Sequence, residues 1–193
     1  MLGLKLPTDP RWVNIAEKSI EEILVDHAYC EQKAATSCIT FIVKYPDHVK
    51  LVETLAPIVT EEWGHFRMVL RELAKRGCTL GPNRNDEYVG QLKKHERTGD
   101  SRERQLMDKL LINALIEARS CERFRLLSLH IGDNELKEFY NELMISEAGH
   151  YVTFVELAKE YMPIDVVEKR LEELLIAEAE IMQNLELRGD RVH

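Results

Sequence analysis

Two stretches decide the fold of this chain, Glu62-Trp-Gly-His65 and Glu147-Ala-Gly-His150. Both are Glu-x-x-His motifs, and each follows a lone glutamate about thirty residues upstream, Glu31 or Glu117. In a helix, residues three positions apart share a face, so each motif presents a carboxylate and an imidazole side by side. The sequence therefore contains one arrangement twice.

The spacing around two turn candidates, Pro46 and Gly132, predicts how each copy folds. In an antiparallel helical hairpin, residues equally far from the turn lie level with each other. The two glutamates of the first copy lie 15 positions before and 16 after Pro46. Those of the second copy both lie 15 positions from Gly132. Each copy is predicted to hold a glutamate opposite a Glu-x-x-His motif.

Apolar residues recur with the helical period of 3.6 through most of the chain. The sequence predicts long helices at about 12–45, 47–76 and 101–131, a fourth up to Tyr161 and a fifth after Pro163. Asp47 is a candidate N-cap and Gly77 a candidate C-cap. Residues 78–100 form a long loop, with a possible short helix at 86–94. The expected fold is all-α, an antiparallel four-helix bundle with that loop after its second helix and an extra C-terminal helix. We expect one domain over 1–193, with a frayed tail at 188–193.

The glutamates of both copies interrupt otherwise apolar helical stripes. Buried carboxylates need a positive partner, and no Lys or Arg lies in these stripes. Two metal ions would reconcile four carboxylates with two imidazoles. Iron or manganese suits such donors, and iron is favoured because di-iron bundles use this ligand set. The predicted ligands are Glu31, Glu62, His65, Glu117, Glu147 and His150.

Three further residues bear on this site. His27 and Asn113 each lie one turn before an upstream glutamate, where they could hydrogen-bond to the ligands or be ordinary polar core residues. Glu122 is the rival to Glu117, but it lies only 10 positions before Gly132 and so falls short of the level of Glu147. We therefore prefer Glu117.

Composition narrows the class of protein. The formal net charge is −8, which argues against non-specific nucleic-acid binding but permits a local basic patch. Lys and Arg gather at 67–76, 93–104 and 119–125, where solvated helix faces are the simplest interpretation. No segment has the roughly 20 apolar residues of a membrane span. The four cysteines form no Cys-x-x-Cys pair. We expect a reduced, cytoplasmic protein that is a monomer or a small homo-oligomer.

Four motifs together resemble the MiaE family of tRNA 2-methylthio-N6-isopentenyladenosine hydroxylases, which are ferritin-like non-haem di-iron monooxygenases. They are Asp26-His-Ala-Tyr-Cys-Glu-Gln-Lys-Ala-Ala35, Glu61-Glu-Trp-Gly-His-Phe66, Glu117-Ala-Arg-Ser-Cys-Glu-Arg-Phe124 and Ser146-Glu-Ala-Gly-His-Tyr151. The resemblance covers nearly the whole chain and implies the same six metal ligands. It implies O2-dependent hydroxylation of the isopentenyl group of the modified adenosine beside the anticodon of tRNA.

Cofactors and partners follow from this resemblance. The resemblance implies two iron ions and O2. It also implies an external electron donor, because the chain has no flavin or nicotinamide fingerprint and no cysteines arranged for an iron–sulfur cluster. Lys93, Lys94 and Arg97 are candidate tRNA contacts. The alternatives are a ferritin-like ferroxidase or iron-storage protein, a peroxide-reducing di-iron protein, a radical-generating subunit, and a metal-free bundle.

Overall fold

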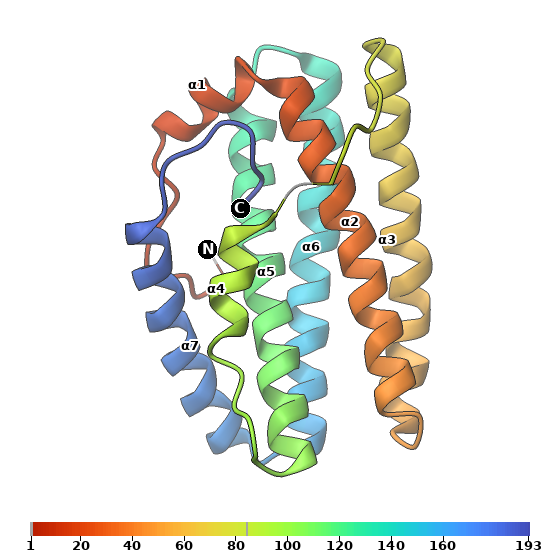
Figure 1. The fold of residues 1–193 in the computed structure, drawn as a ribbon, viewed down its shortest axis with the longest axis vertical. Coiled ribbons are helices and arrows are strands. Elements are labelled where there is room, and N and C mark those ends of the chain that lie inside the picture. The colour runs from red at the N-terminus through yellow and green to blue at the C-terminus, as the bar shows by residue number, and fades with distance from the viewer. Residues whose placement is uncertain (1, 84) are drawn as a thin grey trace. The chain divides into compact units, whose positions relative to one another are not determined.

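The computed structural model describes residues 2–83 and 85–193, and its regular secondary structure there is entirely helical (Figure 1). The predicted all-α class is therefore confirmed. No described helix combines the length and the apolar character needed to cross a membrane. The helices are α1 (Arg11–Glu17), α2 (Ile20–Lys44), α3 (Val49–Lys75), α4 (Glu87–Lys93), α5 (Arg102–His130), α6 (Asn134–Tyr161) and α7 (Ile164–Asn184).

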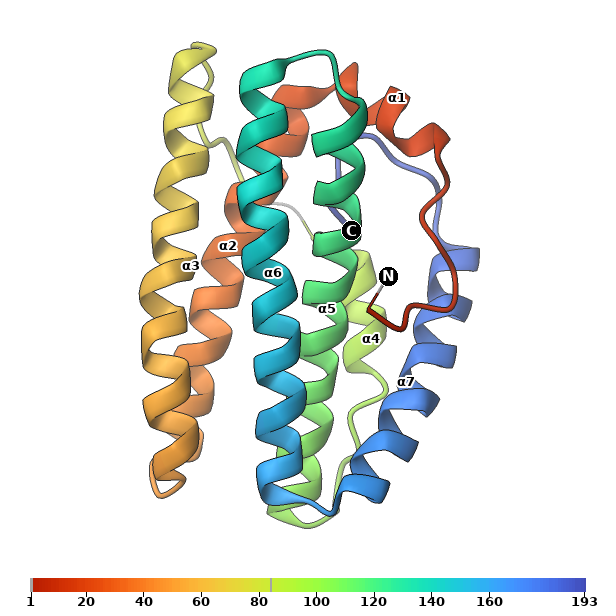
Figure 2. The same cartoon turned by 180° about the vertical axis from the view of Figure 1, so that it is seen from behind.

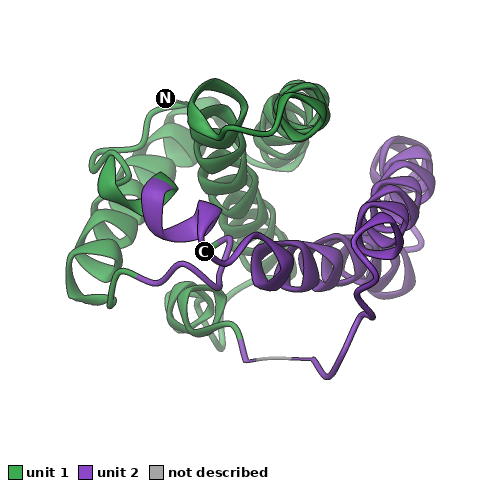
Figure 3. Cartoon of the chain, turned by 90° about the horizontal axis from the view of Figure 1, so that it is seen from above, with its two compact units in different colours: residues 1–13, 86–187, 193 green, residues 14–85, 188–192 purple. Residues whose placement is uncertain are grey.

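The described chain divides into two compact units, which Figure 3 colours separately. One contains residues 14–85 and 188–192, and its main element is the α2–α3 hairpin. The other contains residues 1–13, 86–187 and 193, and its main element is the α5–α6 hairpin. Each unit thus holds one copy of the repeated arrangement, a glutamate opposite a Glu-x-x-His motif. The expectation of one domain over 1–193 stays a prediction.

The α2–α3 hairpin turns at Pro46, as predicted. Two details differ from the sequence analysis. The helix predicted over 12–45 is broken, because Ser19 has φ −130° and ψ 37°, outside the helical region, although the apolar period continues across it. Asp47 is not the N-cap of α3; His48 holds that position, and its side chain makes no capping hydrogen bond.

The C-terminus of α3 shows why the chain leaves the helix at residue 77. Gly77 has φ +68°, a left-handed conformation that glycine adopts without strain. Its N–H donates to the carbonyl of Ala74, and the N–H of Cys78 donates to the carbonyl of Leu73. These two bonds make a Schellman motif, which satisfies the last carbonyls of the helix. The predicted stop at Gly77 is confirmed.

The α5–α6 hairpin turns at residues 131–133 and is covered by further elements of its unit. The Asp133 side chain caps α6 by accepting from the N–H groups of Glu135 and Leu136. Helices α4 and α7 pack against α5, and α6 runs antiparallel beside α5 when seen from behind (Figure 2). The short helix predicted at 86–94 corresponds to α4, and the extra C-terminal helix to α7.

The tail at 188–193 is bound rather than frayed. The backbone N–H of Val192 donates to the carboxylate of Asp26 at 2.8 Å, and the Val192 side chain is fully buried. A Cβ on Gly189 would lie 2.7 Å from the carbonyl oxygen of Ile15, so only glycine allows this approach. His193 stacks on Tyr88 within the other unit, with ring centroids 5.2 Å apart. The expectation of a frayed tail at 188–193 is therefore wrong, because specific partners hold these residues.

Candidate metal centre

In the α2–α3 unit, three predicted ligands come together. The ligand atoms of Glu31, Glu62 and His65 all lie within 4.8 Å of one another, and all three residues are buried. Glu31 comes from α2, whereas Glu62 and His65 come from α3 and share one helical face. His65 Nδ1 lies 3.5 Å from Glu31 and 3.7 Å from Glu62. The hairpin therefore assembles two carboxylates and an imidazole, as the spacing predicted.

The electrostatics of this cluster favour positive charge. Burial lowers the pKa of His65, but hydrogen bonds to Glu31 and Glu62 and the charges of both carboxylates outweigh it. The net effect raises the pKa of His65 to about 10. Two adjacent carboxylates away from water are strongly unfavourable without a cation nearby. A divalent metal would supply that charge and displace the proton from the imidazole.

In the α5–α6 unit, the matching residues form the second cluster. The ligand atoms of Glu117, Glu147 and His150 also lie within 4.8 Å of one another, and all three residues are buried. Glu117 comes from α5, and the other two come from α6. His150 Nδ1 lies 3.9 Å from Glu147. Each hairpin thus holds one Glu opposite a Glu-x-x-His pair, so the duplication seen in sequence is also present in space.

The two residues predicted to support the ligands differ from each other. His27 Nε2 lies 2.6 Å from Glu31 Oε1, and both side chains are buried. This contact fixes the orientation of the Glu31 carboxylate, a predicted metal ligand. Asn113 instead donates from its amide to the carbonyl of Lys109 at 2.8 Å, one turn back along its own helix. A supporting hydrogen bond is therefore evident in the first cluster, whereas the amide of Asn113 is engaged by backbone.

The rival carboxylate, Glu122, belongs to a separate buried network. Its Oε2 accepts from the Thr8 hydroxyl at 2.6 Å and from the Arg119 guanidinium. Arg119 is fully buried and also donates to Glu178 at 2.7 Å. Tyr88 adds a hydrogen bond to the same Glu178 oxygen. Glu122 is thus paired with an arginine, whereas Glu117 lies beside Glu147 and His150, and the preference for Glu117 as the ligand stays a prediction.

Arg123 is also buried, with its guanidinium 4.6 Å from the ring centroid of Trp12. The solvated face predicted for the group at 119–125 is therefore wrong for Arg119 and Arg123. Apart from Glu122, the partners named here, Glu178 and Trp12, lie far away in the sequence, where helical periodicity gives no signal. The acidic Glu178 within the apolar stripe of α7 was the one available clue.

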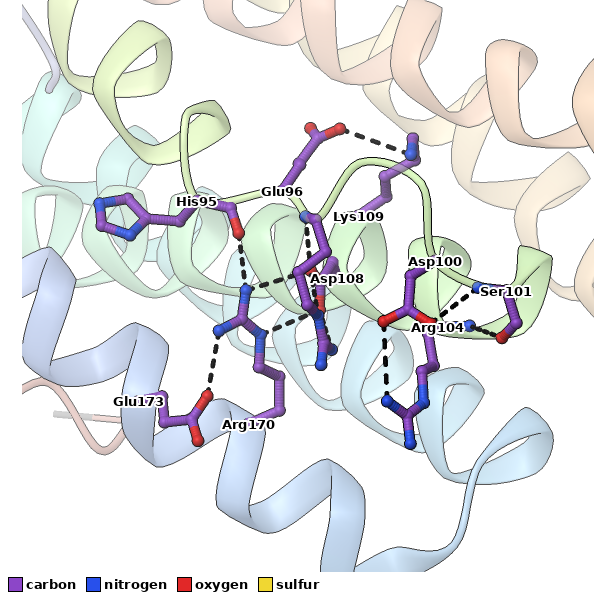
Figure 4. Close-up of polar contacts among 10 residues, drawn as sticks. His95, Glu96, Asp100, Ser101, Arg104, Asp108, Lys109, Arg170 and Glu173 are labelled. Carbon is purple, nitrogen blue, oxygen red and sulfur yellow. Dashed lines mark hydrogen bonds and ion pairs between the residues drawn. The ribbon is translucent and has the colours of Figure 1, made fainter.

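Of the three candidate tRNA contacts, two are exposed and the third is held by a carboxylate. Lys93 and Lys94 are exposed at the end of α4. Arg97 instead donates to both carboxylate oxygens of Asp108, at 3.0 and 2.6 Å. Figure 4 shows Arg170 reaching the same Asp108, together with the carbonyl of His95 and the carboxylate of Glu173. The Arg97 guanidinium therefore fastens the loop after α4 to α5.

Comparison with solved structures indicates the class of protein. The chain is similar to a Synechococcus protein described as having aldehyde deformylating oxygenase activity, with a TM-score of 0.92 and 35% sequence identity. The match covers 98% of this chain and 94% of that one. The likeness confirms the predicted ferritin-like fold. With a buried Glu/Glu/His cluster in each hairpin, the chain is a ferritin-like protein of the di-iron carboxylate class.

Sequence comparison identifies the family. A family model described as tRNA-(MS[2]IO[6]A)-hydroxylase (MiaE) matches residues 2–193. A Pseudomonas putida protein named tRNA 2-(methylsulfanyl)-N(6)-isopentenyladenosine(37) hydroxylase is 36% identical, over 94% of this chain and 87% of its own length. A Salmonella typhimurium protein of the same name is 27% identical, over 84% and 77%. The chain belongs to the MiaE family, which confirms the resemblance found from the four motifs.

Proposed function

We propose that this chain hydroxylates the isopentenyl group of 2-methylthio-N6-isopentenyladenosine in tRNA, beside the anticodon. The observation that carries the proposal is the family match over residues 2–193, which includes both Glu/Glu/His clusters. Curated relatives from two organisms carry the name of this activity. The substrate would be met in the cytoplasm, where tRNA is found.

We propose that the two clusters together bind two iron ions. The donor set fits: each cluster offers two carboxylates and one imidazole, all buried, which suits iron and matches the di-iron bundle pattern. The proposed ligands are Glu31, Glu62, His65, Glu117, Glu147 and His150. When bound, the irons would supply O2 chemistry: one oxygen atom would enter the substrate C–H bond, and the other would leave as water with two electrons from an external donor and two protons from solvent.

The side chains of this protein have defined tasks in that scheme. His27 holds the Glu31 carboxylate in one orientation through their 2.6 Å contact. The carboxylates offset the metal charge, and burial of both clusters limits access of water to the reacting groups. The chain supplies orientation and dryness, and an electron-transfer protein is the remaining partner required.

The decisive experiment is nucleoside mass spectrometry of tRNA from cells with and without this gene product. We expect the hydroxylated nucleoside only in the presence of the protein, with its precursor accumulating in the absence. Purified protein should contain iron by elemental analysis. Equal nucleoside profiles in the two strains would refute the substrate assignment, whatever the iron content.

One specific observation favours a second function. The chain is nearly as similar to the Synechococcus protein with aldehyde deformylating oxygenase activity as to the Pseudomonas hydroxylase, at 35% and 36% identity. Incubating the iron-loaded, reduced protein with a long-chain aldehyde and measuring formate tests this alternative. Formate release together with an unchanged tRNA profile would refute tRNA hydroxylation and support aldehyde deformylation as the function.

A further inference from the structure

Helix α3 carries a row of aromatic and basic side chains on its exposed face. Trp63, Arg67, Arg71 and Lys75 are all exposed and follow one another at four-residue spacing, so they form one oblique stripe along the helix. We call these four residues the α3 basic stripe. The metal-ligating residues of the same helix are buried, so they occupy a different face from the stripe. The stripe starts one residue after Glu62 and thus at the level of the first cluster.

Two of the three cations in the stripe are available to a partner. Within residues 2–83 and 85–193, the side chains of Arg67 and Arg71 make no hydrogen bond or ion pair. Lys75 lies 2.7 Å from Glu72, but that buried carboxylate is shared with Arg76 at 2.8 Å. One carboxylate therefore serves two cations, and the stripe keeps its excess of positive charge.

Trp63 gives the stripe a stacking surface. Its side chain is 47% exposed, although large aromatic residues are usually covered. It is supported from behind by Phe66, with ring centroids 4.8 Å apart. Trp12, the other tryptophan, is fully buried. An exposed indole beside two arginines offers both a flat ring and guanidinium planes.

The surrounding charges make this face unusual for the protein. The chain has a net charge of −8, so exposed cations are generally outnumbered by carboxylates. Between Ala56 and Lys75, Glu61 is the one exposed carboxylate on α3. At 100° per residue it points about 160° away from Trp63. The stripe is therefore a local positive face on an acidic protein.

We propose that the α3 basic stripe docks the anticodon arm of the tRNA substrate. The inference rests on the proposed function and adds the surface that would bind the RNA. Arginine and lysine contacts to phosphates supply affinity for nucleic acid, and unpaired loop bases stack on aromatic side chains and guanidinium groups. An acidic protein partner would use the cations but would not require the exposed indole. The combination of both therefore favours single-stranded RNA.

The proposal differs from the contacts expected at the end of α4. Lys93 and Lys94 are exposed there. The guanidinium of Arg97 is already bound to Asp108 and is therefore less suited to binding a phosphate. The stripe instead combines two unengaged arginines with an aromatic ring. Binding measurements on both surfaces can separate the two assignments.

The test is tRNA binding by the full-length protein. The probe is fluorescently labelled tRNA from cells that lack the hydroxylase, and the dissociation constant is measured by anisotropy over a range of salt. In R67A/R71A, affinity should fall and the log–log salt slope should decrease by about 1.4–1.8, or roughly 0.7–0.9 per lost phosphate contact. W63A should weaken binding about tenfold, whereas W63F should retain most of it.

Two controls match these variants. Lys50→Ala removes an exposed cation from the first turn of the same helix and should leave affinity and salt slope unchanged. K93A/K94A tests the other surface and should change affinity less than R67A/R71A. Because Trp12 is buried, protection of tryptophan fluorescence from acrylamide by added tRNA should report on Trp63. Helical content and iron content should match the wild type in every variant.

The outcomes separate this proposal from the proposed function. If the wild-type protein modifies tRNA in cells but R67A/R71A and W63A bind it with unchanged affinity and salt slope, the docking surface is refuted and the function stands. Unchanged tRNA binding with slower iron reduction by the donor protein would also refute it, in favour of a protein partner. If the wild-type protein neither binds nor modifies tRNA, the proposed function itself fails.

Discussion

Both helical hairpins hold a glutamate opposite a Glu-x-x-His motif, but their helices are buried by other elements to different extents. In α5, 17 of 29 residues are buried, whereas in α3 the number is 9 of 27. Within its own unit, α5 is covered by α4, α7 and the segment around Thr8. The outer face of α3 is instead exposed and basic. The two hairpins thus share the proposed metal ligands, but α5 is covered by other elements of its unit and α3 has an exposed outer face.

The strongest test of this comparison is whether the matched ligands are equivalent. Glu62→Gln and Glu147→Gln each remove one anionic ligand from corresponding positions. Both should lower iron from about two ions per chain and reduce hydroxylated nucleoside to background, because a buried amide cannot replace the ligand charge. Iron is measured by elemental analysis and product by nucleoside mass spectrometry. Glu61→Gln, at the exposed neighbouring position, should keep both. Full iron and activity in either ligand variant would break the equivalence.

The second test concerns the cover of the α5–α6 hairpin. Arg119→Met leaves the buried carboxylates of Glu178 and Glu122 without their arginine. We expect the free energy of unfolding to fall by about 3–5 kcal/mol, the typical cost of breaking a buried ion pair. Denaturant unfolding measures it.

Two variants sharpen this result. Arg125→Met, at an exposed position of the same helix, should change stability by less than about 0.5 kcal/mol. The double variant R119M/E178M should recover part of the loss, because it removes the orphaned charge together with its partner. If R119M is as stable as the wild type, the buried network around Arg119 does not stabilise the packing on the α5–α6 hairpin.

These features also mark how far sequence reasoning reaches. The hairpins and all six proposed ligands followed from helical period and turn position, which are local signals. Glutamates within apolar stripes are informative because burying charge is strongly unfavourable. Gly77 was recognisable as a helix stop because only a left-handed residue completes that motif.

The burial of Arg119 and the binding of the C-terminal tail depend on partners that no local sequence pattern reveals. Arg119 bonds to Glu178, 59 residues away, and Val192 bonds to Asp26, 166 residues away. Without knowledge of these partners, Arg119 was assigned to a solvated face and the tail at 188–193 was expected to be frayed. The break at Ser19 was missed for the opposite reason, since the apolar period continues through a change in backbone conformation.

The third test uses pH to examine how the loop after α4 is held on α5. Burial alone would raise the pKa of Asp108, but hydrogen bonds from Arg97 and Arg170 outweigh it and hold the pKa below its usual range. The resulting stability is fully present above the unfolded pKa of about 3.9 and is lost as pH falls through the folded value. Asp108→Asn should cost about 2–3 kcal/mol at pH 7, less than for R119M because the Arg97 side chain is 33% exposed.

The difference between Asp108→Asn and the wild type should shrink below about pH 4, because the carboxylate is then protonated in the unfolded state before it is protonated in the native state. Denaturant unfolding at pH 7 and at successively lower pH measures this convergence. Asp100→Asn, which affects a partly exposed ion pair with Arg104 at 3.6 Å, is the matched control and should have little effect. A constant gap across this pH range would show that the stabilising charge is elsewhere.

The smallest effect concerns a difference between the residues that precede the two upstream glutamates. His27 contacts Glu31 at 2.6 Å, whereas the amide of Asn113 bonds to the Lys109 carbonyl. His27→Ala should therefore weaken iron affinity about 10–100-fold, as is typical when a ligand loses its supporting hydrogen bond. Asn113→Ala should weaken it much less, because removing that amide leaves the ligand carboxylates of its hairpin in place. Competition with a chelator measures both. Equal losses would mean that Asn113 supports its cluster as His27 does, and the two hairpins would then be alike in ligands and in the residues that orient them.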